Sequence, residues 1–95
     1  MKILAIEKEI KGADWSNAEN TLQAEALHVY DLYLDDKLRE TYFNEHNNAV
    51  LILECENLQS AEQVLQGLPL VKAGLIEFDV MQLNPYTGFK RLIGQ

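Results

Sequence analysis

The chain has 95 residues, of which 47% are hydrophobic, and its 15 acidic residues outnumber its 8 basic ones, which gives a net charge of −7. The length fits one domain, and the hydrophobic fraction is typical of a folded chain rather than a disordered one. Because the negative charge repels phosphate backbones and anionic lipid headgroups, we expect no nucleic acid and no membrane as a partner.

Hydrophobic periodicity predicts a strand, a long helix and a second strand in the first half of the chain. Residues 2–10 alternate as a strand does, with Ile3, Ala5 and Glu7 on one face and Leu4 and Ile6 on the other. Ser16 and Glu19 have the spacing of a capping box, which predicts a helix that runs to about residue 34. Its buried stripe is predicted at helical spacing, in Leu22, Ala26, Val29, Tyr30 and Tyr33. Residues 38–44 read as the second strand.

The second half predicts two more strands, a short helix and a tail. Residues 49–56 are apolar on both faces, so that this strand needs cover on both sides. Ser60 and Gln63 repeat the capping-box spacing and predict a helix over residues 61–66. Residues 75–84 form the last strand, and residues 85–95 keep four large apolar side chains, Tyr86, Phe89, Leu92 and Ile93. We therefore expect the tail to pack on the domain or on a partner chain.

The predicted order, βαββαβ, is that of an α+β ferredoxin-like domain comprising residues 1–95. Its antiparallel four-stranded sheet carries both helices on one face, because crossovers of this kind are right-handed. The other face would hold Ile3, Ala5, Met81, Leu83 and one side of the third strand. A two-fold homodimer that stacks two such faces would bury them, and so would an extra chain segment folded over the face.

Sequence features also bear on the cellular compartment. Glu7, Lys8 and Glu9 stand where a signal peptide needs its apolar stretch, and the longest strongly apolar run, residues 49–53, is too short to span a membrane. The single Cys55 lies in an apolar run and has no second cysteine to pair with. This pattern is typical of a reduced core thiol, so that we expect a cytoplasmic protein.

A resemblance to a known family lies in the last third of the chain. It is carried by three stretches, Leu65-Gln66-Gly67-Leu68-Pro69-Leu70, Ile76-Glu77-Phe78-Asp79-Val80 and Leu83-Asn84-Pro85. They resemble the C-terminal part of the muconolactone isomerase-like family, which belongs to the dimeric α+β barrel superfamily. In that family a helix ending in a Leu-Pro-Leu turn leads into the last strand and a proline-bearing tail. The order of elements agrees along nearly the whole chain.

The resemblance implies a homodimer whose two sheets close into a barrel, with further assembly in some members. It narrows the chemistry less, because the superfamily spans lactone isomerisation, heme degradation, oxygenation without cofactors and plain ligand binding. In the isomerase the first helix carries a Glu that is a candidate base, whereas this chain offers Glu25 and His28 in a different setting. The residues before the third strand differ as well, being Arg39, Thr41, Tyr42, Glu45 and His46 here. The lactone substrate is therefore not carried over.

Acid–base chemistry is predicted first for Glu7, Glu77 and Asp79. The first and last strands are neighbours in this fold, and strand parity places the three acids together on the face assigned to the dimer interior. Clustered carboxyl groups have raised pKa values, which suits a general acid or base. The alternative is that these acids are solvated or pair with Arg39, which is otherwise predicted to bind a charged group of the substrate.

The remaining candidates are histidines and aromatic residues. His28, beside the apolar stripe of the first helix, is a further catalytic candidate, and His46 in the polar hairpin is a binding candidate. The alternative is that His28 is a residue at the border of the core and that His46 is simply an exposed turn residue. Trp15, Tyr42 and Tyr86 are predicted to line or close an apolar pocket. The two histidines give no metal-ligand spacing, and no cofactor is predicted.

These features predict a protein that binds a small apolar or aromatic metabolite, with isomerisation or a related proton transfer as its chemistry. A second hypothesis is a non-enzymatic dimeric module for ligand binding or assembly. It predicts that the acidic residues are solvated. A third hypothesis, a member that handles heme or oxygen, requires an iron ligand.

Overall fold

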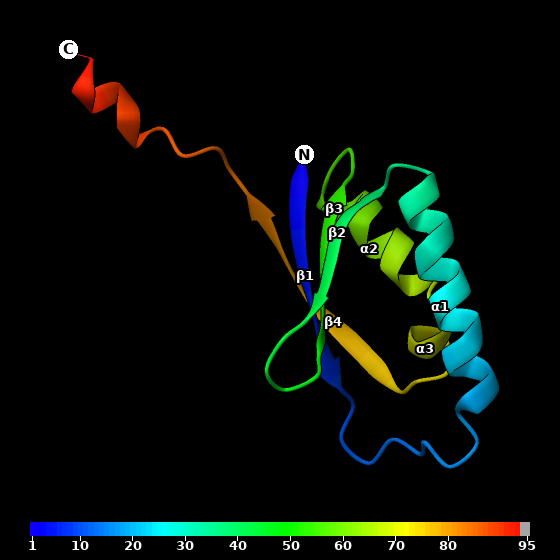
Figure 1. Cartoon of the computed structure of the whole chain (residues 1–95). Coiled ribbons are helices and arrows are strands. Elements are labelled where there is room, and N and C mark those ends of the chain that lie inside the picture. Colours follow the sequence, from blue (N-terminus) through cyan, green and yellow to red (C-terminus); the bar gives the residue numbers. More distant parts are fainter. Residues whose placement is uncertain (94–95) are drawn as a thin grey trace.

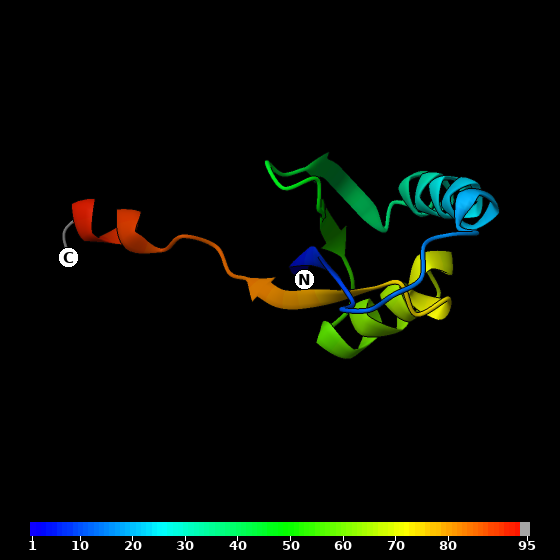
Figure 2. The same cartoon turned by 90° about the horizontal axis from the view of Figure 1, so that it is seen from below.

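The structure is a computed structural model that describes residues 1–93, and it arranges one antiparallel sheet against a layer of helices (Figure 1). The elements, in chain order, are β1 (Lys2–Glu9), α1 (Glu19–Leu34), β2 (Leu38–Phe43), β3 (Ala49–Glu54), α2 (Leu58–Gln66), α3 (Pro69–Lys72), β4 (Ile76–Leu83) and the 3-10 helix η1 (Gly88–Leu92). The strands are ordered β2-β3-β1-β4. The predicted α+β ferredoxin-like fold is confirmed, and the helices lie on one side of the sheet while the tail leaves on the other (Figure 2).

Both helix starts differ from the predicted capping boxes. The helix α1 begins after Ala18 without a side-chain cap, and the Ser16 N–H donates to Asp14 Oδ1 at 2.9 Å in the loop before it. The helix α2 begins at Leu58, earlier than predicted, because Asn57 Oδ1 accepts the Ser60 N–H at 2.7 Å. Asp and Asn side chains compete well for such N–H groups, which explains why the serine-based reading was wrong at both ends.

The short helix α3 was absent from the sequence-based prediction. It begins at Pro69, a residue whose fixed backbone angle suits the first turn of a helix. Leu68 and Leu70 on either side of the proline are buried, so that the Leu-Pro-Leu turn anchors α3 in the core. The backbone N–H of Leu70 thereby faces α1, where it takes part in the site described below.

The hydrophobic core lies between the sheet and the helices, and it reverses one predicted face. Ile3 pairs with Leu53 and Ala5 with Leu51, and directly paired residues share a face of the sheet. All four side chains are buried beneath the helices. The prediction that Ile3 and Ala5 lie on the uncovered face is therefore wrong. Both faces of β1 are apolar, so that alternation alone did not show which face the helices cover.

The helix α1 also buries a narrower stripe than predicted. Of the predicted stripe only Val29 packs against the core, and the other four residues are exposed, namely Leu22, Ala26, Tyr30 and Tyr33. The buried residue of the helix is Leu32, which lies outside the predicted stripe. When a helix lies over the edge of a sheet, only a narrow strip of the helix surface contacts the sheet. Helix residues beside that strip remain in solvent.

The uncovered face of the sheet is apolar at its centre. We call it the open face, and its apolar residues are Leu4, Ile6, Val50, Ile52, Met81 and Leu83. Five of the six are partly buried by their neighbours and Met81 is 46% exposed. Met81 and Leu83 thus lie where the sequence placed them. A patch of this kind is a candidate interaction surface.

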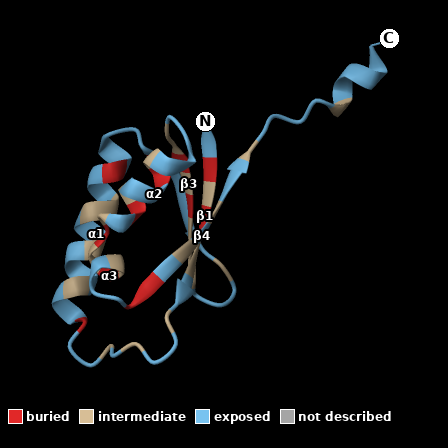
Figure 3. Ribbon diagram, turned by 180° about the vertical axis from the view of Figure 1, so that it is seen from behind, coloured by how far each residue is buried: buried red, intermediate tan, exposed pale blue. Residues whose placement is uncertain are grey.

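The tail runs away from the domain after β4 (Figures 1 and 3). Its four apolar residues are exposed, with Leu92 and Ile93 at 81% and 82%. Tyr86 packs edge-on against Phe89 with ring centroids 4.9 Å apart, so that the tail contacts itself rather than the sheet. In the single chain the apolar residues of the tail stay exposed, and the packing of the tail on a partner chain stays a prediction.

None of the helices within residues 1–93 is long and apolar enough to cross a membrane.

Candidate functional site

A cavity of about 530 Å³ lies between α1, the loop that precedes it and the end of the sheet where β1, β2 and β3 meet. This volume suits a small ring compound. Most of the lining is apolar or uncharged, and the lining residues are Glu7, Trp15, Leu22, Glu25, Ala26, Val29, Thr41, Phe43, Asn47, Ala49, Leu51, Leu70 and Phe78. Two carboxyl groups inside an apolar cavity make it the candidate site.

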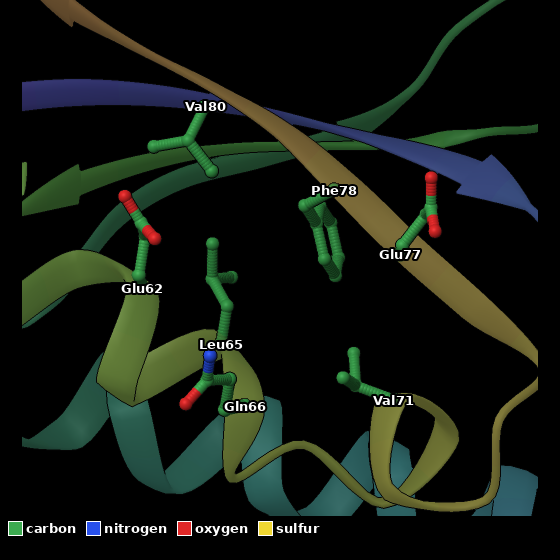
Figure 4. A pocket seen from close by; sticks show the side chains of 7 residues that line it. All are labelled: Glu62, Leu65, Gln66, Val71, Glu77, Phe78 and Val80. Atoms are coloured by element: carbon green, nitrogen blue, oxygen red, sulfur yellow. The ribbon is translucent and has the colours of Figure 1, made fainter. Parts of the chain in front are cut away.

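A smaller cavity of about 220 Å³ lies between α2, α3 and β4 (Figure 4). Leu65, Val71 and Phe78 point toward one another at its centre, and Glu77 lies at one end. Its polar residues lie at the rim and are exposed. Phe78 lines both cavities, so that its ring forms part of the wall between them.

Glu25 is held in the large cavity by the helix α1 and by the start of α3. Its Oε1 accepts the backbone N–H of Leu70 at 2.9 Å, and the side chain is half-buried. Burial raises the pKa of the Glu25 carboxyl, because the charged form loses water. The Leu70 N–H and the charge of His28 lower this pKa, and the charge of Glu7 raises it, but burial is the largest effect.

Glu7 approaches the same cavity from the end of β1. Its Oε1 accepts the backbone N–H of Ala49, the first residue of β3, at 2.9 Å. The side chain is half-buried and lines the same cavity as Glu25, and its charge contributes to the raised pKa of Glu25. A carboxyl group whose pKa is raised accepts and holds a proton more readily than a solvated one. Glu25 can therefore serve as a general base or acid on a bound molecule.

Trp15 closes the cavity on the side of the loop between β1 and α1. Its ring packs against the cluster formed by Ala18, Leu70, Leu75 and Ile76. The indole Nε1–H is buried without a hydrogen-bond partner, and no other side-chain nitrogen or oxygen within residues 1–93 is in that condition. A buried donor without a partner loses about 1–3 kcal/mol relative to water.

The predicted acidic cluster is divided by the sheet. Glu7 pairs with Phe78 and lies on the helix side, whereas Lys8 pairs with Glu77 on the open face. The Lys8 Nζ lies 3.3 Å from Glu77 Oε1 and 3.0 Å from Asp79 Oδ1. The Asp79 and Glu77 carboxylates raise the pKa of Lys8. The prediction that Glu7 shares a face with Glu77 and Asp79 is wrong. Glu7 pairs with Phe78, and the odd-numbered residues of β4 on either side of Phe78 point to the opposite face.

The other candidate residues lie outside the cavity. His28 is on α1 close enough to act on the charge of Glu25, but it is not part of the lining. Tyr42 is on the open face, where its hydroxyl donates to Glu40 at 2.8 Å. Arg39 is exposed where the pairing of β2 shifts register, and His46 is exposed in the turn after β2. Tyr86 lies in the tail. Of the nine candidates, the structure therefore brings only Glu7 and Trp15 into the cavity.

Sequence reasoning did not select Glu25, although a signal for it was present. Glu25 stands between Leu22 and Val29, three and four residues from them, and next to Ala26. A carboxyl group at a position within an apolar helical stripe is expected to be partly buried. The apolar lining residues Phe43, Leu51 and Leu70 carried no such signal, because each also fits an ordinary core position.

No family model matches the chain, and no curated protein matches it. Several solved structures are similar to it, and two of them are described here. One is muconolactone isomerase, with a TM-score of 0.74, 16% identity, and 92% of each chain covered. The other is a 5-chloro-2-hydroxyhydroquinone dehydrochlorinase from Burkholderia phenoliruptrix AC1100 in complex with 2,5-dihydroxybenzoquinone, with a TM-score of 0.70, 17% identity, and 93% of this chain and 98% of that one covered.

The comparisons show that this chain has the same fold as these two proteins. The resemblance noted in the last third of the sequence is thereby confirmed at the level of the fold, over nearly the whole chain.

Proposed function

We propose that the chain binds a small apolar or aromatic molecule in the large cavity and moves a proton on it, as an isomerase does. The observation that carries the proposal is the half-buried Glu25, whose pKa is raised by burial and which shares an otherwise uncharged cavity with Glu7. The two similar structures support this proposal through their names, since one is an isomerase and the other was solved with a benzoquinone.

Glu25 would act as the base that takes a proton from the carbon beside a carbonyl group. The electron pair of that C–H bond moves into the ring as an enolate, and the proton returns at another carbon of the same conjugated system. Substrate and product then differ only in the position of a double bond. The proton shuttles on the Glu25 carboxyl and the Glu7 charge tunes its affinity, so that no oxidant or cofactor is consumed.

We also propose that a second copy covers the open face. Two features support this proposal. The open face carries the apolar residues Leu4, Ile6, Ile52 and Met81, and the apolar residues of the tail are exposed. The homodimer would bury the patch and give the tail a partner surface.

The same exposed surfaces favour a second candidate, a non-enzymatic dimeric module whose role is ligand binding or assembly. The two candidates differ in the cavity: only the enzyme requires the charge of Glu25, since an amide at that position could still accept the Leu70 N–H.

The test uses α-angelica lactone, a neutral ring compound whose double bond migrates by proton transfer beside a carbonyl. Its conversion to the conjugated isomer and its uptake of deuterium from D₂O are followed by NMR. We expect turnover by the wild-type chain and a loss of about 100-fold or more in Glu25→Gln, which keeps the hydrogen bond to Leu70 and removes the base. Glu77→Gln, on the open face, is the matched control and should retain the full rate.

Equal turnover by wild type and Glu25→Gln would exclude Glu25 as the base. Binding of the lactone, seen as shifts of cavity resonances, without any turnover would favour the non-enzymatic module.

A further inference from the structure

A second apolar surface lies on the outside of α1, away from the core. Leu27, Tyr30 and Leu34 follow one another three and four residues apart, so that they lie along one side of the helix. Tyr33, three residues after Tyr30, lies beside them. All four side chains are exposed, and Leu27 is 62% exposed. We call these four residues the α1 stripe. A contiguous exposed apolar patch of this kind marks an interaction surface.

The charges around the α1 stripe are negative. Asp31 lies four residues after Leu27, and Asp35 lies four residues after Asp31, so that both flank the same side of the helix. Residues 12–36 contain no Lys or Arg. The C-terminal end of a helix also carries partial negative charge, and the last turn of α1 has no basic residue to balance it. A partner for this surface should therefore combine apolar and basic side chains.

The tail has this combination. Phe89 and Leu92 are three residues apart on η1, a spacing that places both on one side of a 3-10 helix. Lys90 and Arg91 lie between them, and residues 84–93 contain no acidic residue. These four side chains are exposed. Within residues 1–93, the two basic residues form no ion pair, and neither do the two aspartates beside the α1 stripe.

The tail is too short to reach the α1 stripe of its own chain. It leaves from β4 at one edge of the sheet, whereas α1 contacts β2 at the other edge. Three strand spacings make the sheet about 14 Å wide. Residues 84–87, which join β4 to η1, span at most about 14 Å. The width of the sheet uses up this length before the chain could turn toward the helices. Figure 2 accordingly shows the tail and α1 at opposite ends of the molecule.

The open face matches the tail less well than α1 does. Its acidic residues Glu77 and Asp79 already share the ammonium group of Lys8. The basic residues of the tail would compete there with a cation that is in place, whereas the aspartates beside the α1 stripe have no cation.

We propose that the tail of one copy docks on the α1 stripe of a second copy. The apolar residues of the tail cover the stripe, and its two basic residues meet Asp31 and Asp35. This contact goes beyond the proposed function, which concerns the cavity and the open face. The α1 stripe and the open face lie on opposite sides of the sheet, so that each contact can be tested without the other.

The test uses the full chain in a mixed sample, in which half of the copies carry ¹³C and ¹⁵N and the other half are unlabelled. Isotope-filtered NMR then detects only contacts between copies. We expect nuclear Overhauser effects between the methyl groups of Leu27 and Leu34 in labelled copies and the ring of Phe89 in unlabelled ones. Absence of these effects would overturn the proposal. Effects seen only in a uniformly labelled sample would show docking within one chain and would overturn it as well.

A charge reversal tests why the tail selects this surface. Lys90→Glu combined with Arg91→Glu should abolish the effects between copies, because like charges then meet beside the α1 stripe. Lys11→Glu combined with Lys72→Glu is the matched control, since both residues are exposed outside the tail and the net charge changes equally. The control should keep the effects. Persistence of the contact in the tail variant would overturn the role of the two basic residues.

A charge exchange completes the test. Asp31→Lys and Asp35→Lys, added to the reversed tail, restore opposite charges with their signs exchanged. Lys suits the last turn of a helix, so that these changes leave α1 folded. We expect the effects between copies to return. If they stay absent in a chain whose other resonances are unchanged, the pairing of the tail with these two aspartates is wrong.

Discussion

The two faces of the sheet carry carboxyl groups of the same kind in opposite surroundings. On the helix side, Glu7 is half-buried, accepts a backbone N–H and shares a cavity with Glu25. On the open face, Glu77 and Asp79 are exposed and share the ammonium group of Lys8. Glu7 and Lys8 are consecutive residues of β1, yet Glu7 lies on the helix side and Lys8 on the open face. The surroundings of a carboxylate on this sheet therefore depend on which face its side chain lies on, and nearness along the strand contributes little.

The largest difference between the faces should appear in stability. Leu53 is fully buried on the helix side of β3, and Ile52 beside it lies on the open face. Leu53→Ala should lower the free energy of unfolding by about 2–5 kcal/mol, because it leaves a cavity in the core. Ile52→Ala should cost clearly less in a monomer. Urea denaturation of both variants at protein concentrations where the chain is monomeric checks this, and equal losses there would show that the open face is packed as tightly as the core.

The assembly provides the second test of the comparison. Ile6→Glu places a carboxylate at the centre of the open face, between Val50 and Asp79 across the neighbouring strands. If a second copy covers this face, the buried charge should dissociate the homodimer into monomers that remain folded. Native mass spectrometry of wild type and variant gives the masses. A wild-type monomer, or a variant that stays dimeric, would contradict the open face as the dimer interface.

The smallest effect is the pH dependence that Glu25 contributes. Burial raises its pKa above the unfolded value of about 4.5, so that the folded chain holds the proton more tightly. This contribution to stability is fully present below the unfolded pKa and is lost as the pH rises through the folded pKa. In Glu25→Gln the loss should disappear. Urea midpoints of both proteins across the acidic range measure the difference, and parallel curves would show that Glu25 is not desolvated.

Much of the fold could be predicted from the sequence. The order of strands and helices is correct, and the predicted strand ends agree with the observed ones within two residues, because β-branched and alternating patterns are strong local signals. The first helix was located by its period, although its cap was misassigned. The short helix α3 was missed, since four residues around a proline carry too little periodicity to stand out.

Less of the site could be predicted. Trp15 was chosen as a residue that could line or close an apolar pocket, and it does line the cavity. Glu7 was chosen together with Glu77 and Asp79 by strand parity. Glu7 lines the cavity, but the register of β1 against β4 puts the other two acids on the opposite face. Glu25 was mentioned only through the family resemblance, because its partners, Leu70 and Glu7, are distant along the chain.

The sequence by itself determined the class of fold, the acidic character and the presence of more apolar surface than two helices can cover. These properties depend on composition and on short-range periodicity, which act within a few residues. Only the tertiary structure decided which face of β1 the helices cover, and hence which carboxyl groups are desolvated together. The covered face depends on the register between strands and on which side of the sheet the crossover helices pack. Both depend on contacts between residues far apart in the chain.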